Sequence, residues 1–289
     1  MNRTLRIYLI ALVAFSLNPV FAQSARRATG RHFKGPLAVQ LWSFRDDFKK
    51  DVPGTLKRVR ELGFTNVELA GYYGLTAKDF RAQLDKAGLR AVSMHIEYEV
   101  ARDRIDEVIR DAGILGVQFV GVPWINSPFT RQDCLAAIDV FNQAGRKLAA
   151  KGFRFFYHLH GYEFVPDEGG KGSLFDLMMT RTNPRFVSMQ LDTFHVAYPG
   201  QDPVKLMRKY PGRFSSLHLK DIRKDTVGDN SGDFKDEDGR PLGEGRIDWP
   251  AVLKAARQEG VRWYIIEDET SAVWAGVVKS LTYLHNVTF

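Results

Sequence analysis

Residues 150–160 read Ala-Lys-Gly-Phe-Arg-Phe-Phe-Tyr-His-Leu-His. Gly152 is typical of the residue that follows the last turn of a helix. The run Arg154–His160 is mostly aromatic and apolar, which predicts a strand covered on both faces. Two histidines close the run, so polar side chains come where the strand leaves the core. The stretch predicts one unit of helix end, buried strand and polar strand end.

The same unit recurs along the chain. Glycines that end a helical pattern also precede other apolar runs, as at Gly63, Gly88 and Gly260. The pattern predicts eight strands: Leu37–Trp42, Asn66–Ala70, Leu89–His95, Gln118–Val122, Arg154–His160, Phe186–Leu191, Phe214–Leu219 and Trp263–Glu267.

Amphipathic helices are expected between these strands, and several have readable first residues. Thr76, Thr130, Asp202 and Asp248 are side chains that cap helix N-termini. Eight alternating strands and helices in about 250 residues are typical of parallel strands that close into a barrel. No Gly-x-Gly-x-x-Gly follows the first strand, which disfavours an open dinucleotide-binding sheet. We therefore predict an α/β fold, a single (β/α)8 TIM barrel over residues 36–289.

The first 35 residues have a different character. Residues 1–22 combine a basic start, an apolar run and a Val-Phe-Ala end before Gln23, which predicts a cleaved signal peptide. Residues 23–35 form a basic leader. The apolar run is too short to be a good membrane span, so no stable span is expected after cleavage. The predicted location is the periplasm or the exterior of the cell.

The net charge of +7 is concentrated in this N-terminal part. Residues 1–35 hold six basic side chains and no acid, so residues 36–289 hold 35 basic side chains against 34 acidic ones. A nearly neutral folded part argues against nucleic acid as a partner. A small carbohydrate is the expected partner, and the sequence leaves a homo-oligomer open.

Polar side chains gather at the predicted C-terminal strand ends, where barrel enzymes carry their active sites. Five of the seven histidines lie there, among carboxylates from several strands. The polar residues at or near these ends are Gln40, Glu68, His95, Glu97, His158, His160, Glu163, Asp192, His195, His218, Lys220, Asp221, Glu267, Asp268 and Glu269. Nitrogen and oxygen donors without thiolates suit Mn²⁺, Mg²⁺, Co²⁺ or Zn²⁺ in a reactive rather than a structural site. Such an ion can polarise a sugar carbonyl while a neighbouring base removes a proton.

These residues sit in short motifs spread over the predicted barrel. The motifs are Val39-Gln40-Leu-Trp-Ser-Phe-Arg-Asp46, Asn66-Val-Glu68-Leu69, Tyr157-His158-Leu-His160-Gly-Tyr-Glu163-Phe164, Leu191-Asp192-Thr-Phe-His195, Leu217-His218-Leu-Lys220-Asp221, Gly243-Glu-Gly-Arg-Ile-Asp-Trp249 and Ile265-Ile-Glu267. At these motifs the chain resembles the sugar phosphate isomerase/epimerase superfamily, the xylose isomerase-like TIM barrels, over residues 37–289.

The resemblance implies a metal site with ligands from strands five to eight. Asp192, His218 and Glu267 match three of the ligands, whereas the family's strand-five glutamate is missing. Either His158 or His160 replaces it, or Glu163 reaches in; we place His158 in the predicted metal set. The resemblance also implies that His195 and Glu163 contact the substrate.

The predicted activity is that of a metal-dependent isomerase or epimerase of a non-phosphorylated keto-sugar or related carbohydrate, because phosphorylated sugars belong inside the cell and the chain is expected to be exported. The expected catalytic side chains are His160, His195, Glu163 and Glu267. Those expected to bind substrate are Gln40, Glu68, His95, Trp124 and Lys220.

Three other functions remain open. A lyase or hydratase would begin with the same proton abstraction and then eliminate a neighbouring oxygen, as from a 3-keto-glycoside, with His160 and His195 as acid and base. A carbohydrate-binding barrel without turnover is a second alternative. The DNA-repair endonuclease branch of the superfamily is the least favoured, because its extra metal ligands are not evident.

Some side chains have two interpretations at this stage. Trp42, Trp124 and Phe156 could form an apolar wall for a sugar or belong to the core. Lys220 and Asp221 could form an ordinary surface ion pair, which would contribute little to stability.

Overall fold

The computed structural model describes residues 30–289, and within them eight parallel strands close into a barrel. The barrel strands are β1 (Leu37–Gln40), β2 (Asn66–Leu69), β3 (Arg90–His95), β4 (Phe119–Val122), β5 (Arg154–His158), β6 (Val187–Asp192), β7 (Phe214–Leu219) and β10 (Trp263–Ile266). Each strand pairs with its sequence neighbour, and β1 pairs with both β2 and β10. The predicted (β/α)8 barrel is confirmed, and each predicted strand overlaps an observed one.

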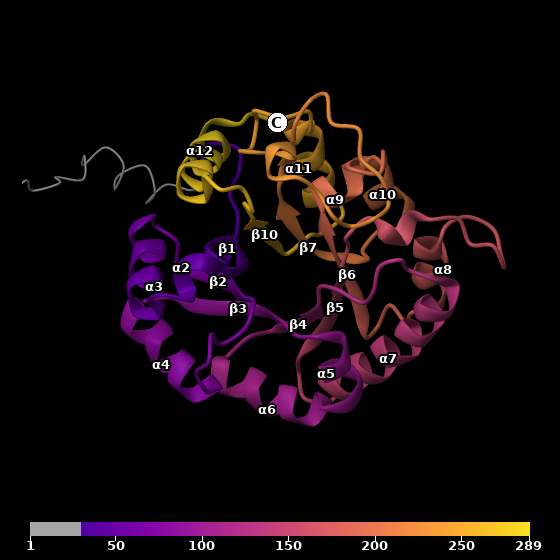
Figure 1. The fold of residues 1–289 in the computed structure, drawn as a ribbon, viewed down its shortest axis with the longest axis horizontal. Coiled ribbons are helices and arrows are strands. Elements are labelled where there is room, and N and C mark those ends of the chain that lie inside the picture. The colour runs from indigo at the N-terminus through magenta and orange to yellow at the C-terminus, as the bar shows by residue number, and fades with distance from the viewer. Residues whose placement is uncertain (1–29) are drawn as a thin grey trace, which may run out of the picture.

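The helices form a ring around these strands (Figure 1). The longer ones are α3 (Val52–Glu61), α4 (Ala77–Ala87), α6 (Ile105–Leu115), α7 (Arg131–Ala149), α8 (Leu174–Arg181), α10 (Pro203–Lys209), α11 (Trp249–Gln258) and α12 (Val273–Asn286). All four predicted caps form, because the side chains of Thr76, Thr130, Asp202 and Asp248 each accept a hydrogen bond from a backbone N–H of the first turn. Short helices α5 (Tyr98–Asp103) and α9 (Thr193–Ala197) follow β3 and β6, and α2 (Arg45–Phe48) follows β1 after a 3₁₀ turn at Leu41–Phe44.

The barrel interior is filled by side chains, with one aromatic ring admitted by a glycine. The ring of Phe156 on β5 is fully buried against Gly121 on β4. A Cβ atom at Gly121 would lie 2.1 Å from that ring, so β4 needs glycine at this position. Of the two interpretations of Phe156, core packing is therefore correct.

The described end of the basic leader packs on the barrel. Phe33 is buried and meets Tyr264 edge to face at 5.2 Å, and His32 Nδ1 lies 3.3 Å from the carbonyl oxygen of Phe289. Residues 30–35 thus belong to the fold, unlike the expectation of a leader outside it. The reason is that Phe33 supplies a large apolar ring that the end of the barrel can cover. The predicted signal peptide lies outside the described residues.

The long segment after β7 is ordered by hydrogen bonds. It contains the short antiparallel pair β8 (Asp221–Ile222) and β9 (Gly239–Arg240) and a 3₁₀ turn at Asp236–Asp238. Asp221 is fully buried, and its carboxylate accepts bonds from backbone N–H groups of Gly243 and Gly245 and from the indole of Trp249. The interpretation of Asp221 as half of a surface ion pair is therefore wrong. Among residues 30–289, no helix combines the length and the apolar character needed to cross a membrane.

Candidate metal centre and active site

Four side chains converge at the C-terminal end of the barrel. They are His158, Asp192, His218 and Glu267, and one donor atom from each lies within 4.8 Å of those of the other three. Asp192 and His218 are register partners on β6 and β7, so the parallel pairing itself brings them together. Glu267 follows β10, and its Oε2 lies 3.1 Å from His218 Nδ1. These four residues are the predicted metal set.

One buried oxygen in this cluster has no hydrogen-bond partner. Asp192 Oδ1 accepts the backbone N–H of His195 at 2.9 Å, whereas its Oδ2 has none. That Oδ2 lies 3.8 Å from His218 Nδ1. A buried carboxylate oxygen without a donor is costly unless a cation meets it. The donor set of two imidazoles and two carboxylates fits a divalent metal ion.

The electrostatics of the cluster also favour a bound cation. Burial raises the pKa of Asp192 to about 7. Burial also opposes ionisation of Glu267, but the charge and hydrogen bond of His218 lower the pKa of Glu267 to about 2. Burial would lower the pKa of His218, yet Glu267 and Glu68 raise it to about 10. Buried carboxylates thus draw positive charge to this point, which is the electrostatic condition for binding a cation.

A hydrogen-bonded layer beneath the cluster fixes its histidines. Glu68, fully buried on β2, lies 2.5 Å from His218 Nε2 through its Oε1. Gln190 on β6 accepts from His158 Nδ1 at 2.9 Å and from His95 Nε2 at 3.0 Å through its Oε1. These bonds turn His218 Nδ1 toward Glu267 and Asp192 and leave His158 Nε2 as the atom of His158 that could bind a metal ion. A carboxylate or amide behind each histidine sets the tautomer and the ring orientation that a metal ligand requires.

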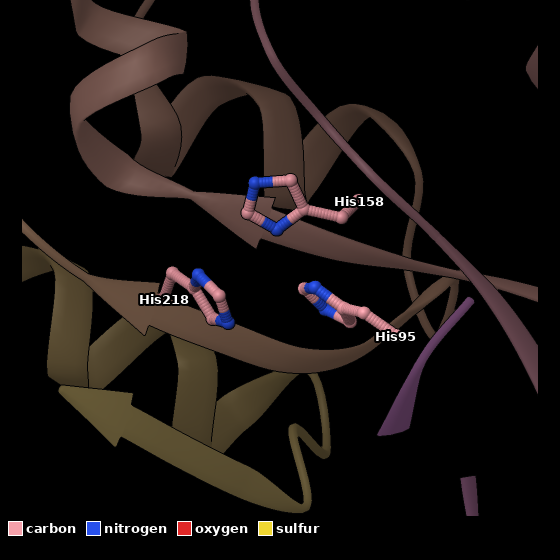
Figure 2. A group of neighbouring side chains, drawn as sticks. All are labelled: His95, His158 and His218. Carbon is pink, nitrogen blue, oxygen red and sulfur yellow. The ribbon is translucent and has the colours of Figure 1, made fainter. Parts of the chain in front are cut away.

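His95, His158 and His218 form a second group of potential ligands, and Figure 2 shows their rings facing one another from three strands. The inward nitrogens of this group are already occupied by Glu68 and Gln190. Gln40 completes the network, since its amide donates to Glu68 at 2.8 Å and contacts His95 Nδ1 at 3.4 Å. We therefore interpret His95 as a support of the metal group, defined as His158, Asp192, His218 and Glu267, and not as a further ligand. Gln40 and Glu68, predicted to bind substrate, lie in this buried layer instead.

A cavity of about 710 Å³ opens above the metal group. Its lining includes residues from the ends of the strands and from the segment after β7: Trp42, Arg45, Ala70, His95, Glu97, Pro123, Trp124, His158, His160, His195, Gly232, Asp233, Phe234, Asp236, Glu267 and Glu269. The volume falls within the range of ordinary small-molecule sites, which is roughly 300–1,000 Å³. His95 and Trp124, two of the predicted substrate-binding residues, line it.

Two further histidines, His160 and His195, line the cavity together with His158 and Glu267. The ring of His160 lies 4.7 Å from that of His158 and 4.5 Å from that of His195. The buried Nδ1 of His160 has no hydrogen-bond partner. Burial lowers the pKa of His160 to about 3 and holds the pKa of His195 well below its usual range. The predicted acid–base pair therefore lines the cavity beside the metal group.

Glu163 does not reach the cavity. It is fully buried, and its carboxylate accepts from the Tyr157 hydroxyl and from the backbone N–H groups of His160 and Gly161. Gly161 adopts a left-handed φ of 91°, and Glu163 bonds to the backbone of this turn and is absent from the cavity lining. The expectation that Glu163 contacts the substrate or the metal is thus not met, and the side chain instead positions the turn that carries His160.

Lys220 is also placed differently from the expectation. It is buried, it donates a short hydrogen bond to Glu269, and it lies over the ring of Phe234 at 4.1 Å. It is absent from the cavity lining, so Glu269 is the member of the pair that a substrate would meet. Sequence reasoning noted Glu269 only as a strand-end acid and gave Arg45 and Phe234 no role. The sequence did offer a signal for these two residues, because Arg45 lies just after β1 and Phe234 lies in the segment after β7.

The comparisons with known proteins agree with this geometry. The chain matches the model of the xylose isomerase-like TIM barrel family over residues 56–284. It is 27% identical to a sugar phosphate isomerase/epimerase from Parabacteroides distasonis of known structure, with a TM-score of 0.70 over 87% of this chain and 94% of that one. The resemblance seen in the sequence is confirmed.

Curated relatives carry the name inosose dehydratase. The protein of that name from Bacillus cereus is 31% identical over 153 residues, which are 50% of this chain and 50% of the relative. The one from Geobacillus kaustophilus is 24% identical over 260 residues, covering 76% of this chain and 83% of the relative. The chain thus spans about half the length of several curated relatives, and most of the length of one.

Proposed function

This chain belongs to the xylose isomerase-like TIM barrel family, and we propose that it is a metal-dependent lyase that eliminates a β-oxygen substituent from a cyclic keto-polyol or keto-sugar. The proposal rests on which side chains lie at the end of the cavity next to the metal group. Beside the metal group lie the paired imidazoles of His160 and His195, while Glu163, the acid after β5 that was expected to contact the substrate, bonds to Tyr157 instead. A base and an acid side by side suit elimination, whereas two-base epimerisation needs groups on opposite faces of the sugar.

The metal would be held by His158, Asp192, His218 and Glu267. When bound there, a divalent ion supplies polarisation of the substrate carbonyl and stabilises negative charge on its oxygen. Side chains of the protein would transfer the protons. We assign to His160, through its unpartnered Nδ1, and to His195 the removal of the proton beside the ketone and the return of a proton to the departing oxygen.

Only the substrate and these two side chains exchange protons and electrons in the elimination. The C–H electron pair becomes the new C=C bond next to the ketone as the C–O bond at the next carbon breaks. The electron pair of that C–O bond stays on the departing oxygen, which takes up a proton and leaves as water or an alcohol. The relatives named inosose dehydratase support this reaction class by their names.

The cavity favours a substrate without phosphate. Its lining carries five carboxylates, Glu97, Asp233, Asp236, Glu267 and Glu269, against the single guanidinium of Arg45. Arg45 itself lies 4.0 Å from Glu269. Phosphate binding normally uses several cationic or backbone N–H donors, which this lining does not concentrate.

An isomerase or epimerase is the second candidate, favoured by the similarity to the Parabacteroides protein of that name. Both reactions begin with the same proton removal, so one experiment separates them. The metal-loaded protein is incubated in D₂O with an inosose and with phosphate-free keto-sugars, and the products are followed by NMR. The proposal expects an unsaturated ketone that has lost the proton beside its carbonyl, and no such product after chelation. Exchange that yields only an isomer would indicate an isomerase instead of a lyase. Binding without exchange would indicate a carbohydrate-binding barrel without turnover.

The cellular location remains part of the proposal. The predicted signal peptide at residues 1–22 would place the mature enzyme in the periplasm or outside the cell. Amino-terminal sequencing of the protein from the extracytoplasmic fraction tests this, and a mature start at Gln23 is expected.

A further inference from the structure

The cavity extends beyond the metal group, and we call the part lined by Trp42, Arg45, Trp124, Asp233, Asp236 and Glu269 its outer part. Four large hydrophobic side chains of the described chain are exposed: Trp42, Ile114, Trp124 and Val227. Two of them, Trp42 and Trp124, line the cavity, with 44% and 36% of their surface exposed. Single exposed apolar residues are ordinary, but two indoles at the mouth of one cavity form a surface suited to binding.

Each indole is held by neighbouring groups and is partly exposed at the cavity. Trp42 donates from Nε1 to Glu269 at 2.9 Å, and the guanidinium of Arg45 lies 5.1 Å from its ring centre. Trp124 meets the ring of Tyr162 edge-on at 4.9 Å. Gly232 packs on the same indole, where a Cβ atom would come within 3.0 Å. Rigidly held aromatic rings lose little conformational freedom when a ligand packs on them.

The two indoles approach the mouth from different sides. Trp42 follows β1 and Trp124 follows β4, and β2 and β3 lie between these strands in the barrel. The polar side chains of the outer part are Arg45, Asp233, Asp236 and Glu269. Apolar ring faces with hydrogen-bonding groups around them match a carbohydrate ring, whose C–H face is apolar and whose rim carries hydroxyl groups.

The outer part is joined to the metal group through His160. The ring of His160 lies 5.0 Å from that of Trp124 and 4.7 Å from that of His158. A ligand that reaches from the metal group to Trp124 therefore passes beside His160. An oxygen atom that links two rings of such a ligand would lie where the proposed reaction needs its departing oxygen.

On the basis of the proposed elimination, we infer that the substrate carries a second sugar ring, which binds between Trp42 and Trp124 and leaves as the alcohol. The bond that breaks joins the keto-sugar carbon to the bridging oxygen, and its electron pair goes to that oxygen. The proton lost beside the ketone leaves the C=C bond behind, and the bridging oxygen takes up a proton as the second sugar departs. No oxidant or reductant is consumed.

A binding experiment tests this inference apart from turnover. Maltose, cellobiose and trehalose are titrated calorimetrically against methyl glucoside and phenyl glucoside, with the metal-loaded protein. At least one disaccharide should bind about tenfold more tightly than methyl glucoside. Trp42→Ala and Trp124→Ala should remove most of that difference, whereas Val227→Ala, at an exposed site outside the cavity, should keep it.

Two results would overturn the inference. Equal affinities for methyl glucoside and every disaccharide would mean that the outer part holds no second ring. Tighter binding of phenyl glucoside than of any disaccharide would mean that the partner is an aromatic group instead. Failure of the proposed function shows separately, as absence of an unsaturated product from ketone substrates, and leaves the binding comparison intact.

Discussion

Glu68 Oε1 lies 2.5 Å from His218 Nε2, although the two residues are 150 positions apart and come from β2 and β7. Burial opposes the ionisation of Glu68, but His95 and His218 hold the pKa of Glu68 well below its usual range. The carboxylate therefore accepts the Nε2 proton of His218, and the opposite nitrogen, Nδ1, is turned toward Glu267 and Asp192, where a metal ion could replace its proton. The orientation of one proposed ligand thus depends on a residue that does not touch the metal.

Replacing Glu68 should weaken metal binding without removing a ligand. Glu68→Gln keeps the size of the side chain but loses the charge that orients His218. We expect the affinity for Mn²⁺, measured by calorimetry, to fall about 10- to 100-fold, as is usual for such supporting groups. Ser93→Ala is the matched control, since Ser93 donates to the other oxygen, Oε2, of Glu68. Its effect should be several times smaller, and unchanged affinity in Glu68→Gln would argue against the assigned role.

Asp192→Asn should abolish both metal and turnover while the barrel stays folded. The asparagine can still accept the His195 N–H, as Asp192 Oδ1 does, but it cannot offer a charged Oδ2. Elemental analysis should find one metal ion per wild-type chain and far less than one in the variant. Asp106→Asn, at an exposed carboxylate on α6, should retain the ion. A fully loaded Asp192→Asn protein would rule out this carboxylate as a ligand.

Phe33 tests whether residues 30–35 belong to the fold. Because the ring is buried against Tyr264, Phe33→Ala should lower the free energy of unfolding by about 3–5 kcal/mol. Denaturant titration measures the change. Val227→Ala, at a side chain that is 93% exposed, should leave it nearly unaltered. Equal stability of Phe33→Ala and the wild type would mean that residues 30–35 do not contribute to the fold.

Asp176 should make stability depend on pH in acid. Burial opposes its ionisation, but hydrogen bonds from Lys209 and Tyr210 lower the pKa of Asp176 to about 2, against an ordinary value of 3.8. A lowered folded-state pKa stabilises the fold above 3.8, and this contribution is lost as the pH falls through about 2. The stability difference between wild type and Asp176→Asn should therefore be largest above pH 3.8 and shrink toward pH 2. A difference that is constant with pH would contradict the assignment.

Local signals in the sequence account for the parts of the fold that were predicted well. Helix α4 spans Ala77–Ala87 as expected, because the Thr76 cap and the left-handed Gly88 are fixed by neighbouring residues. The metal set was predictable for a related reason. Parallel strands bring their C-terminal ends to one edge, so polar residues at several strand ends must meet there.

The parts that were not predicted depend on contacts between distant residues. Phe156 enters the core because Gly121 on the neighbouring strand leaves room for its ring. Trp42 bonds Glu269 across 227 positions, and neither residue's sequence neighbourhood signals the other. Glu163 is turned away by the left-handed Gly161, a geometry that the motif does not reveal.

The most direct test of the account is the position of the bound metal. Diffraction from crystals of the Mn²⁺-loaded protein, collected at the manganese absorption edge, locates the ion through its anomalous signal. We predict one peak in coordination contact with His158, Asp192, His218 and Glu267. A peak between His95, His158 and His218, or no peak in a protein that eliminates its substrate, would contradict the proposed centre.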